Sequence, residues 1–333
     1  MTDHSIRFAA FDGIRETALE LGVDPEPIFR CNQLDPDTLN DPDARIPYIR
    51  LINTLNDMAL ATATPHFGLL IAGKQHLSTM GLLGEVAGDA PTIGQAIRDI
   101  DEHLRVHNSG ARSMCEVEGD IATWRIAVDL EGGMELKQKH LLSIGFGFQI
   151  LRQLAGPNWL PSRVQFDHIQ PEDIRPYKQF FHCPVLFGQE FPALCFPRSV
   201  LDLPSQTKND EEYFRLKCDL ENTDRMLPEE FSELFQRKTT EAIEQGLFSA
   251  VHIAAVLGIS SRTLHRRLRE EMDTNFREAA DSIRIQIGMK YMRNTTLPLM
   301  EIADILGYSE LAAFSRAFKR KVGCSPREWR SRA

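Results

Sequence analysis

The feature that most constrains the fold of this chain is a short pattern that occurs twice within residues 251–328. The two copies read IAAVLGIS at 253–260 and IADILGYS at 302–309. Their glycines, Gly258 and Gly307, lie 49 residues apart, and isoleucine, alanine, leucine, glycine and serine all recur at this offset. The chain therefore contains one small structural unit twice.

Each copy has the pattern of a helix-turn-helix. The first helix carries apolar residues at helical spacing, which are Ile253, Val256 and Leu257 in the first copy. The glycine then takes up a backbone conformation that is costly for other residues, and the serine two positions later can cap the second helix. That second helix buries apolar residues at positions i and i+4, here Leu264 and Leu268. In a helix-turn-helix the second helix lies in the major groove of DNA.

The two second helices differ by one residue in register. Leu264 is six positions after its glycine, whereas Phe314 is seven positions after its own and pairs with Phe318 at i+4. The two recognition faces are therefore not identical, and we expect the two copies to read different DNA sequences.

Residues 228–330 resemble the DNA-binding domain of the AraC/XylS family of bacterial transcription regulators. The resemblance includes the one-residue shift, and the second copy continues through FSRAFKR at 314–320 to GCSP at 323–326. Two earlier segments, 79–97 and 180–203, resemble an N-terminal, arabinose-binding-like domain found in one branch of that family. The resemblance implies that this domain binds a small molecule and mediates dimerisation.

The first recognition helix offers basic side chains on the face opposite Leu264. Arginine can donate two hydrogen bonds to guanine, which is worth about 1–3 kcal/mol of discrimination between bases. A solvated basic face is the alternative, but the repeat favours base contact, while Arg267 and Arg269 suit phosphates or solvent. The candidates for DNA contact are Ser261, Arg262, His265 and Arg266.

The second recognition helix offers a less basic face. Arg316 suits a phosphate as well as a base, and a small residue such as Ala312 can contact a thymine methyl group. The second unit is therefore expected to position the protein more than it specifies a sequence. Its candidates for DNA contact are Glu310, Ala312, Ser315 and Arg316, while Lys319, Arg320 and Lys321 are expected to face the DNA backbone or solvent.

Charge is distributed unevenly along the 333 residues, which are enough for two domains. Residues 231–333 hold 17 Lys and Arg against 12 Asp and Glu, whereas the rest of the chain holds 21 against 35, within a net charge of −9. A basic end on an acidic body fits one DNA-binding domain and one domain with another task.

The first 220 residues mix helical and strand periodicities and predict an α+β domain. Helical spacing dominates before Gly110, beginning with an expected helix over 8–21. Period-2 alternation on both sides of Gly119-Asp120 then predicts a β-hairpin. The remaining expected elements are helices over 134–154, 172–180 and 211–220 and strands at 164–168, 185–187 and 192–196.

We expect three segments along the chain. Residues 1–220 form the α+β sensing and dimerisation domain, 221–228 form a polar linker, and 229–333 form the all-α double helix-turn-helix domain. In the last, a helix over 275–293, capped by Thr274, joins the two units. A rigid connecting helix suits two recognition helices that enter adjacent major grooves about 34 Å apart.

No enzyme motif is present, since the chain lacks G-x-S-x-G, a Walker A loop and a G-x-G-x-x-G turn. No cofactor is expected. His103 and His107 lie four apart on a predicted helix, a spacing that suits a metal, but a solvated helix surface is favoured and no metal is expected. Six aromatic residues could line an apolar pocket in the N-terminal domain: Phe146, Phe148, Phe166, Phe180, Phe181 and Trp124. For most of them an ordinary position in the hydrophobic core is favoured. The effector-binding residues stay unidentified.

The chain has no run of 18 apolar residues and no signal sequence, so we expect a cytoplasmic protein without membrane contact. None of the six cysteines has C-x-x-C spacing, and disulfides are not expected.

We therefore interpret the chain as a sequence-specific transcription regulator, in the activator role usual for the family, that a small-molecule effector controls. The expected partners are double-stranded DNA, RNA polymerase, the effector and a second copy of the chain. One alternative is an N-terminal domain that only dimerises or binds a partner protein. Another is a DNA-repair alkyl-transfer enzyme fused to a similar domain, which needs clustered cysteines that the spacing does not offer.

Overall fold

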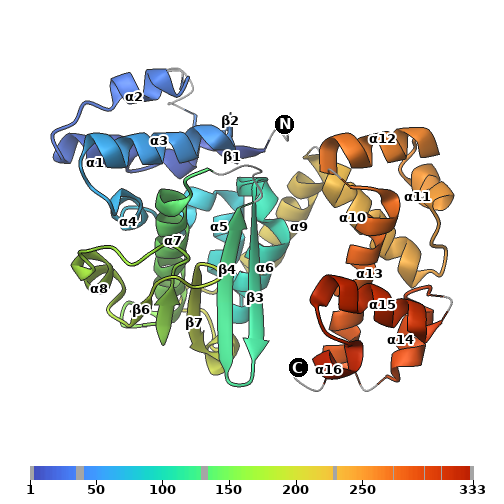
Figure 1. Cartoon of the computed structure of the whole chain (residues 1–333). Helices are drawn as coiled ribbons and strands as arrows, with labels where there is room; N and C mark the ends of the chain where they lie inside the picture. The colour runs from blue at the N-terminus through green and yellow to red at the C-terminus, as the bar shows by residue number, and fades with distance from the viewer. Residues whose placement is uncertain are drawn as a thin grey trace. The chain divides into compact units, whose positions relative to one another are not determined.

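The computed structural model divides the chain into two compact units, Thr2–Leu227 and Pro228–Ala333 (Figure 1). None of the helices in the described part of the chain combines the length and apolar character that a membrane crossing requires. The structure describes residues 4–34, 41–128, 134–227, 231–272, 274–295, 297–308 and 310–330.

The N-terminal unit begins with a short two-stranded sheet and a broken helix. Strand β1 (Ser5–Arg7) pairs antiparallel with β2 (Arg45–Pro47). The single helix expected over 8–21 is instead a 3-10 turn, η1 (Phe8–Phe11), and a separate helix, because Gly13 between them adopts a φ of 84°. The helices that follow are α1 (Ile14–Glu20), α2 (Glu26–Cys31), α3 (Tyr48–Ala61), α4 (Phe67–Ala72), η3 (Leu77–Met80), α5 (Leu82–Asp89) and α6 (Ile93–His107).

A five-stranded sheet forms the β part of this unit. Its strands lie in the order β3-β4-β7-β5-β6, and every pair is antiparallel except β5 with β6. The predicted hairpin is confirmed, with Gly119 at a φ of 57° in the turn and Cys115 opposite Trp124. The strands are β3 (Ala111–Glu118), β4 (Ile121–Val128), β5 (Arg163–Gln165), β6 (Val185–Leu186) and β7 (Ala193–Pro197).

Helix α7 (Lys137–Ala155) is the centre of the N-terminal core. It contacts β4 and β7 of the sheet and also packs on α3 and α4. It approaches α4 closely at Gly68, where a Cβ atom would lie 2.2 Å from the backbone oxygen of Gln138. The shorter helices α8 (Arg175–Phe181) and η4 (Arg198–Asp202) lie beside the strands that follow α7 in the chain. The expected apolar face of α7 is confirmed as buried: Leu141, Ile144, Phe148 and Leu151.

Helix α9 (Asp210–Met226) is longer than the sequence indicated. The segment 221–228 was expected to be a linker, but it is helical up to Met226. The helix ends at Leu227, which is extended because a residue directly before a proline disfavours helical geometry. Asp224 holds these turns in place because it is bonded to side chains of α6. Asn222, Thr223 and Arg225 are polar and exposed to solvent. A polar composition therefore hid two turns of helix.

The C-terminal unit is all helical, so the predicted fold class, an α+β domain followed by an all-α domain with two helix-turn-helix units, is confirmed. One hydrophobic core contains residues of both helix-turn-helix units and of α13, the long helix between the two units. The helices are α10 (Phe231–Glu244), α11 (Ala250–Val256), α12 (Ser261–Met272), α13 (Phe276–Asn294), α14 (Leu299–Ile305), α15 (Leu311–Val322) and α16 (Pro326–Arg330).

Candidate nucleic-acid interface and effector cavity

Helices α11 and α12 form the first helix-turn-helix. Gly258 in the turn adopts a φ of 68°, and Ser260 Oγ accepts a hydrogen bond from the backbone N–H of Thr263 at 3.1 Å, so both predicted roles are confirmed. Ile253 is buried, but Val256 is 43% exposed. The expectation for Val256 was wrong because α11 is only two turns long and turns Ile253 and Ala254 toward the core.

Helices α14 and α15 form the second helix-turn-helix. Gly307 adopts a φ of 72°, and Phe314 and Phe318 are both fully buried, as predicted. Ser309, the expected cap, lies outside the described residues. Glu310 occupies the N-cap position of α15 without a capping hydrogen bond from its side chain.

The one-residue shift between the copies lies in the turn and not in the recognition helices. Helix α12 begins three residues after Gly258, and α15 begins four residues after Gly307. Leu264 and Phe314 are therefore both the fourth residue of their helix. The same alignment places Arg262 opposite Ala312 in the repeat, and it matches His265 with Ser315 and Arg266 with Arg316.

The outward face of α12 is strongly basic. Arg262, His265 and Arg266 are exposed and Ser261 is half-buried, and the ion pair between Arg266 and Glu270 is long at 3.7 Å. Arg267 lies apart from this face, because it bonds Glu271 and its guanidinium lies 4.1 Å from the ring centre of Phe231. The helix thus presents arginines one turn apart, free to meet DNA.

The outward face of α15 carries less charge. Ala312 and Arg316 are exposed, and Ser315 is half-buried. Arg316 lies 3.3 Å from exposed Glu310 at the start of the same helix. The structure therefore brings the four candidates of each recognition helix to one face, with unequal basic character.

Helix α13 holds the two helix-turn-helix units in one body. Its N-cap is Asn275, whose side chain accepts from the backbone N–H of Glu278 at 3.1 Å, so the expected cap at Thr274 was one residue early. Near its middle, Gly288 lets the second unit approach, since a Cβ atom there would lie 3.0 Å from Leu306 Cδ1.

A charged cluster on α13, which the sequence interpretation missed, adds a second connection. The Arg284 guanidinium lies 3.7 Å from the ring centre of Phe248 and 4.7 Å from that of Tyr308, and it donates to the carbonyl of Gly307 at 3.1 Å. Burial lowers the pKa of Arg284. The available signal was the second repeat itself, which has Tyr308 where the first has an isoleucine.

Asp281 completes this cluster. It accepts from the hydroxyl of Tyr308 at 3.2 Å and from Arg320 at 2.8 Å. Burial, followed by the Asp281 charge, raises the pKa of Tyr308. Arg320 is exposed, in agreement with the expectation that it faces the DNA backbone or solvent, and it also pairs within the unit because α13 carries a carboxylate within its reach.

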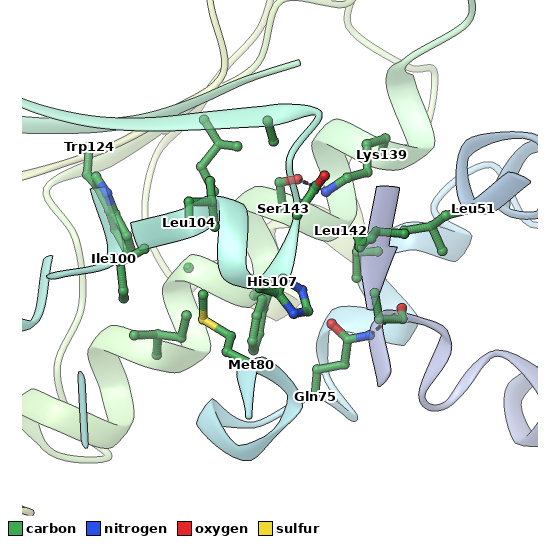
Figure 2. Close-up of a pocket in the computed structure, with 18 residues that line it drawn as sticks. Leu51, Gln75, Met80, Ile100, Leu104, His107, Trp124, Lys139, Leu142 and Ser143 are labelled. Atoms are coloured by element: carbon green, nitrogen blue, oxygen red, sulfur yellow. Dashed lines mark hydrogen bonds between the residues drawn. The ribbon is translucent and has the colours of Figure 1, made fainter. Parts of the chain in front are cut away.

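The N-terminal unit contains a cavity of about 50 Å³, shown in Figure 2. Helices α3, α6 and α7 and strands β3 and β4 supply most of its wall. Of the aromatic candidates, only Trp124 and Phe146 line it. The other four pack against one another in the core, with ring centres about 5–6 Å apart: Phe148, Phe166, Phe180 and Phe181.

His103 and His107 are neither a metal pair nor a solvated surface. Helix α6 departs from helical geometry at His103, whose Nδ1 lies 3.2 Å from an Asp224 oxygen. His107 is 7% exposed and lines the cavity. Within the described ranges no group of three or more His, Cys, Asp and Glu side chains is placed to hold a metal ion.

Comparison with known proteins agrees with both halves of this architecture. Residues 22–205 match the arabinose-binding domain of AraC transcription regulators, N-terminal, and residues 253–332 match a helix-turn-helix domain. The chain belongs to the AraC family of transcription regulators. As a member of this family it is a DNA-binding transcription regulator with an arabinose-binding-like N-terminal domain.

Full-length relatives share this organisation at low identity. The HTH-type transcriptional regulator VirS of Mycobacterium tuberculosis is 26% identical over 98% of this chain and 96% of its own. The ornithine utilization regulator of Pseudomonas aeruginosa is 23% identical over 99% of this chain and 97% of its own. The crystal structure of the transcriptional regulator CdpR from Pseudomonas aeruginosa covers 92% of this chain and 96% of its own, at 20% identity and a TM-score of 0.46.

Proposed function

We propose that this AraC-family regulator is an activator whose N-terminal unit binds a small-molecule effector in this cavity. The unit that ends at Leu227 senses the effector and dimerises, and the unit that follows binds DNA and contacts RNA polymerase. The observation that carries the proposal is the position of α6, which lines the cavity with one face and binds α9 with the other.

The cavity face of α6 consists of Ile100, Leu104 and His107. The opposite face holds α9 at two points. Near the middle, Asp99 accepts hydrogen bonds from α9, and near the end Arg105 bonds Asp224 at 2.7 Å. Because α9 is the last helix before the DNA-binding unit, an effector that moves α6 also moves α9 or breaks these bonds. Such an effector controls the protein when it favours one of the two arrangements.

The two recognition helices enter adjacent major grooves, about 34 Å apart. The first, with Arg262 and Arg266, provides most of the base discrimination, because its outward face is the more basic. The second, with Arg316, provides mainly positioning. The proposed DNA contacts are Ser261, Arg262, His265, Arg266, Glu310, Ala312, Ser315 and Arg316.

The test is DNA binding by the full chain to a selected operator, with and without each member of an effector panel. We expect one effector class to change operator affinity about 5- to 150-fold, the usual range of allosteric coupling. Replacing Asp224 with Asn should weaken that change while the effector still binds. If every effective ligand left DNA affinity unchanged, regulation would act through contact with RNA polymerase instead.

A binding panel in which no small molecule bound would contradict effector control. It would favour an N-terminal unit that only dimerises or binds a partner protein. The oligomeric state in solution, measured over a range of concentrations, tests dimerisation separately, and a monomer at all concentrations would contradict that part of the proposal.

A further inference from the structure

The cavity of the N-terminal unit contains a buried lysine that has no acidic partner among the described residues. Lys139 on α7 is 7% exposed and lines the cavity. Its Nζ contacts Ser143 Oγ one turn along the helix and lies 5.7 Å from the ring centre of Tyr48. No carboxylate forms an ion pair with it in the part of the chain that the structure describes. Burying an ammonium group without a counter-charge is costly.

The surroundings of Lys139 add positive charge instead of compensating it. Burial lowers the pKa of the His107 imidazole to about 3, and the charges of Arg7, Lys139 and Arg45 act in the same direction. Arg7 is offset by Asp43, whose oxygen lies 2.9 Å from its Nε, but among the described residues Arg45 donates to backbone carbonyls and a serine hydroxyl and to no carboxylate. The polar end of the cavity therefore has a positive potential.

His107 leaves a second polar group without a partner at the cavity. Its Nδ1 is buried and makes no hydrogen bond to any described residue. Buried polar atoms in native proteins are nearly always paired, so an unpaired atom in a cavity wall is a position where a ligand or water can form a hydrogen bond. Burial alone lowers the pKa of Lys139 to about 8, so Lys139 is still largely protonated at neutral pH.

Apart from Gln75, which donates to the carbonyl of Ala10 at 3.0 Å, and Asn108, which accepts from the backbone N–H of Gly110 at 2.9 Å, the rest of the wall is apolar. Figure 2 shows Lys139 and Ser143 on one side of the cavity and Trp124 and Ile100 on the other. The indole N–H of Trp124 does not face the cavity as a free donor, because it already donates to Ser113 at 2.7 Å. The remaining apolar lining comes from Leu51, Met80, Leu104, Ile126, Leu142, Phe146 and Ile150.

We propose that the effector cavity takes a small monocarboxylate, with its carboxylate on Lys139 and its hydrocarbon part toward Trp124 and Ile100. The inference rests on the proposed effector control and names the chemical class of the effector. A cavity of about 50 Å³ holds about three to five water molecules. With the walls in this arrangement, the ligand that fits this volume is a short aliphatic acid.

The wall chemistry disfavours the other common effector classes. An amine places a second cation beside Lys139. A sugar leaves hydroxyl groups unpaired against Leu51, Met80 and Leu142, and a second carboxylate is buried without a partner at the apolar end. A monocarboxylate supplies one counter-charge at one end and apolar surface at the other.

The first experiment measures binding of straight-chain carboxylates from two to eight carbons to the full-length protein by calorimetry and thermal shift. The matched probes are the primary amides and primary amines of the same chain lengths. We expect saturable binding in a narrow window of carboxylate lengths and at least about tenfold weaker binding of the amides, since an amide replaces the hydrogen bond between two charged groups with a weaker one. Equal binding of acids and amides, or no binding of any acid, overturns the proposal.

The second experiment compares Lys139→Met with Lys137→Met. Lys137 lies on the same helix but does not line the cavity, so its replacement is the control. Lys139→Met should bind the selected acid at least about tenfold more weakly, whereas Lys137→Met should bind it like the wild type. Unchanged binding by Lys139→Met overturns the assignment of the carboxylate to Lys139. If that variant fails to fold, the acid-against-amide comparison on the wild-type chain still decides the ligand class.

Operator binding separates this inference from the proposed function. An acid that binds without changing operator affinity supports the ligand class and contradicts effector control of DNA binding. A panel in which a different chemical class binds and changes operator affinity supports effector control and overturns the carboxylate assignment.

Discussion

Lys217 Nζ on α9 lies 2.8 Å from Oδ1 of Asp99, a carboxylate of α6 that has no solvent exposure. The second oxygen of Asp99 accepts from the hydroxyl of Tyr213 at 2.9 Å. Burial lowers the pKa of Lys217, but the hydrogen bonds to Asp99 and Tyr213 outweigh burial and raise it overall. This buried charge network connects the helix that lines the cavity to the helix that precedes the DNA-binding unit.

We predict that Lys217→Met destabilises the N-terminal unit by about 3 kcal/mol, because it leaves the Asp99 carboxylate buried without its cation. Urea unfolding measures the effect. The control is Arg215→Ala on the exposed side of the same helix, where the ion pairs with Glu212 and Asp219 should contribute less than about 1 kcal/mol. A loss of stability as small as that of the control would show that the Asp99 carboxylate can stay buried without the Lys217 ammonium.

Asp224 makes the free energy of unfolding depend on pH in the acid range. Burial raises the pKa of this carboxyl, but the hydrogen bonds from His103 and Arg105 outweigh burial and lower it overall. Because the folded pKa lies below the unfolded one, near 3.9, the stabilisation is present above that value and is lost as the pH falls through the folded pKa. In urea unfolding from pH 6 to pH 2, the advantage of wild type over Asp224→Asn should shrink toward acid. A pH-independent difference would contradict the ion-pair account.

Lys139 makes the stability of the wild type rise with pH in the alkaline range, which is the same direction as for Asp224 in the acid range. Because its folded pKa of about 8 lies below the unfolded value of about 10.4, the unfolded chain binds more protons between these values. The stability of wild type should therefore rise relative to Lys139→Met from pH 8 to pH 10, as thermal unfolding can show. Carboxylate affinity should fall over the same range, since Lys139 loses its charge.

The groups that face Lys139 do not account for such a change. Tyr48 presents its ring from α3 and Ser143 is uncharged, while His107, with a pKa of about 3, is neutral throughout. Carboxylate affinity that did not depend on pH between 7 and 10 would place the anion elsewhere.

Arg262→Ala should cost about 1–3 kcal/mol of operator affinity and relax the preference at one base position, since arginine reads guanine through two hydrogen bonds. Lys319→Ala should weaken binding to all sequences evenly and lower the salt slope by about one. Binding to a library of operator variants at two salt concentrations measures both. Unchanged sequence preference in Arg262→Ala would reassign this residue to a phosphate contact.

Arg284→Met should weaken binding to a complete operator more than binding to a single half-site, because Arg284 connects α13 to both helix-turn-helix units through Phe248 and Tyr308. Competition between the full operator and each isolated half-site measures the ratio. Arg277→Met, exposed on the same helix, is the matched control. Equal losses on full and half sites would indicate that the cluster stabilises the fold without setting the spacing of the two units.

The local parts of this protein follow from the sequence by itself. Gly258 and Gly307 predict left-handed turns because other residues pay for a positive φ, and the apolar pairs at i and i+4 predict which face of each recognition helix is buried. The β-hairpin at Gly119 follows from period-2 alternation in the same way. These features depend on residues that are close in the chain, so their pattern is visible without the fold.

The tertiary structure decided what depends on residues far apart in the chain. The pairing of Asp99 with Lys217 and the isolation of Lys139 arise from packing across more than a hundred residues or between several elements, and no periodicity reports them. The polar turns of α9 and the buried His107 were misread for the same reason. Whether a polar side chain faces water or another helix is settled by the partner that packs against it, and the free energy of burying a charge depends on that partner.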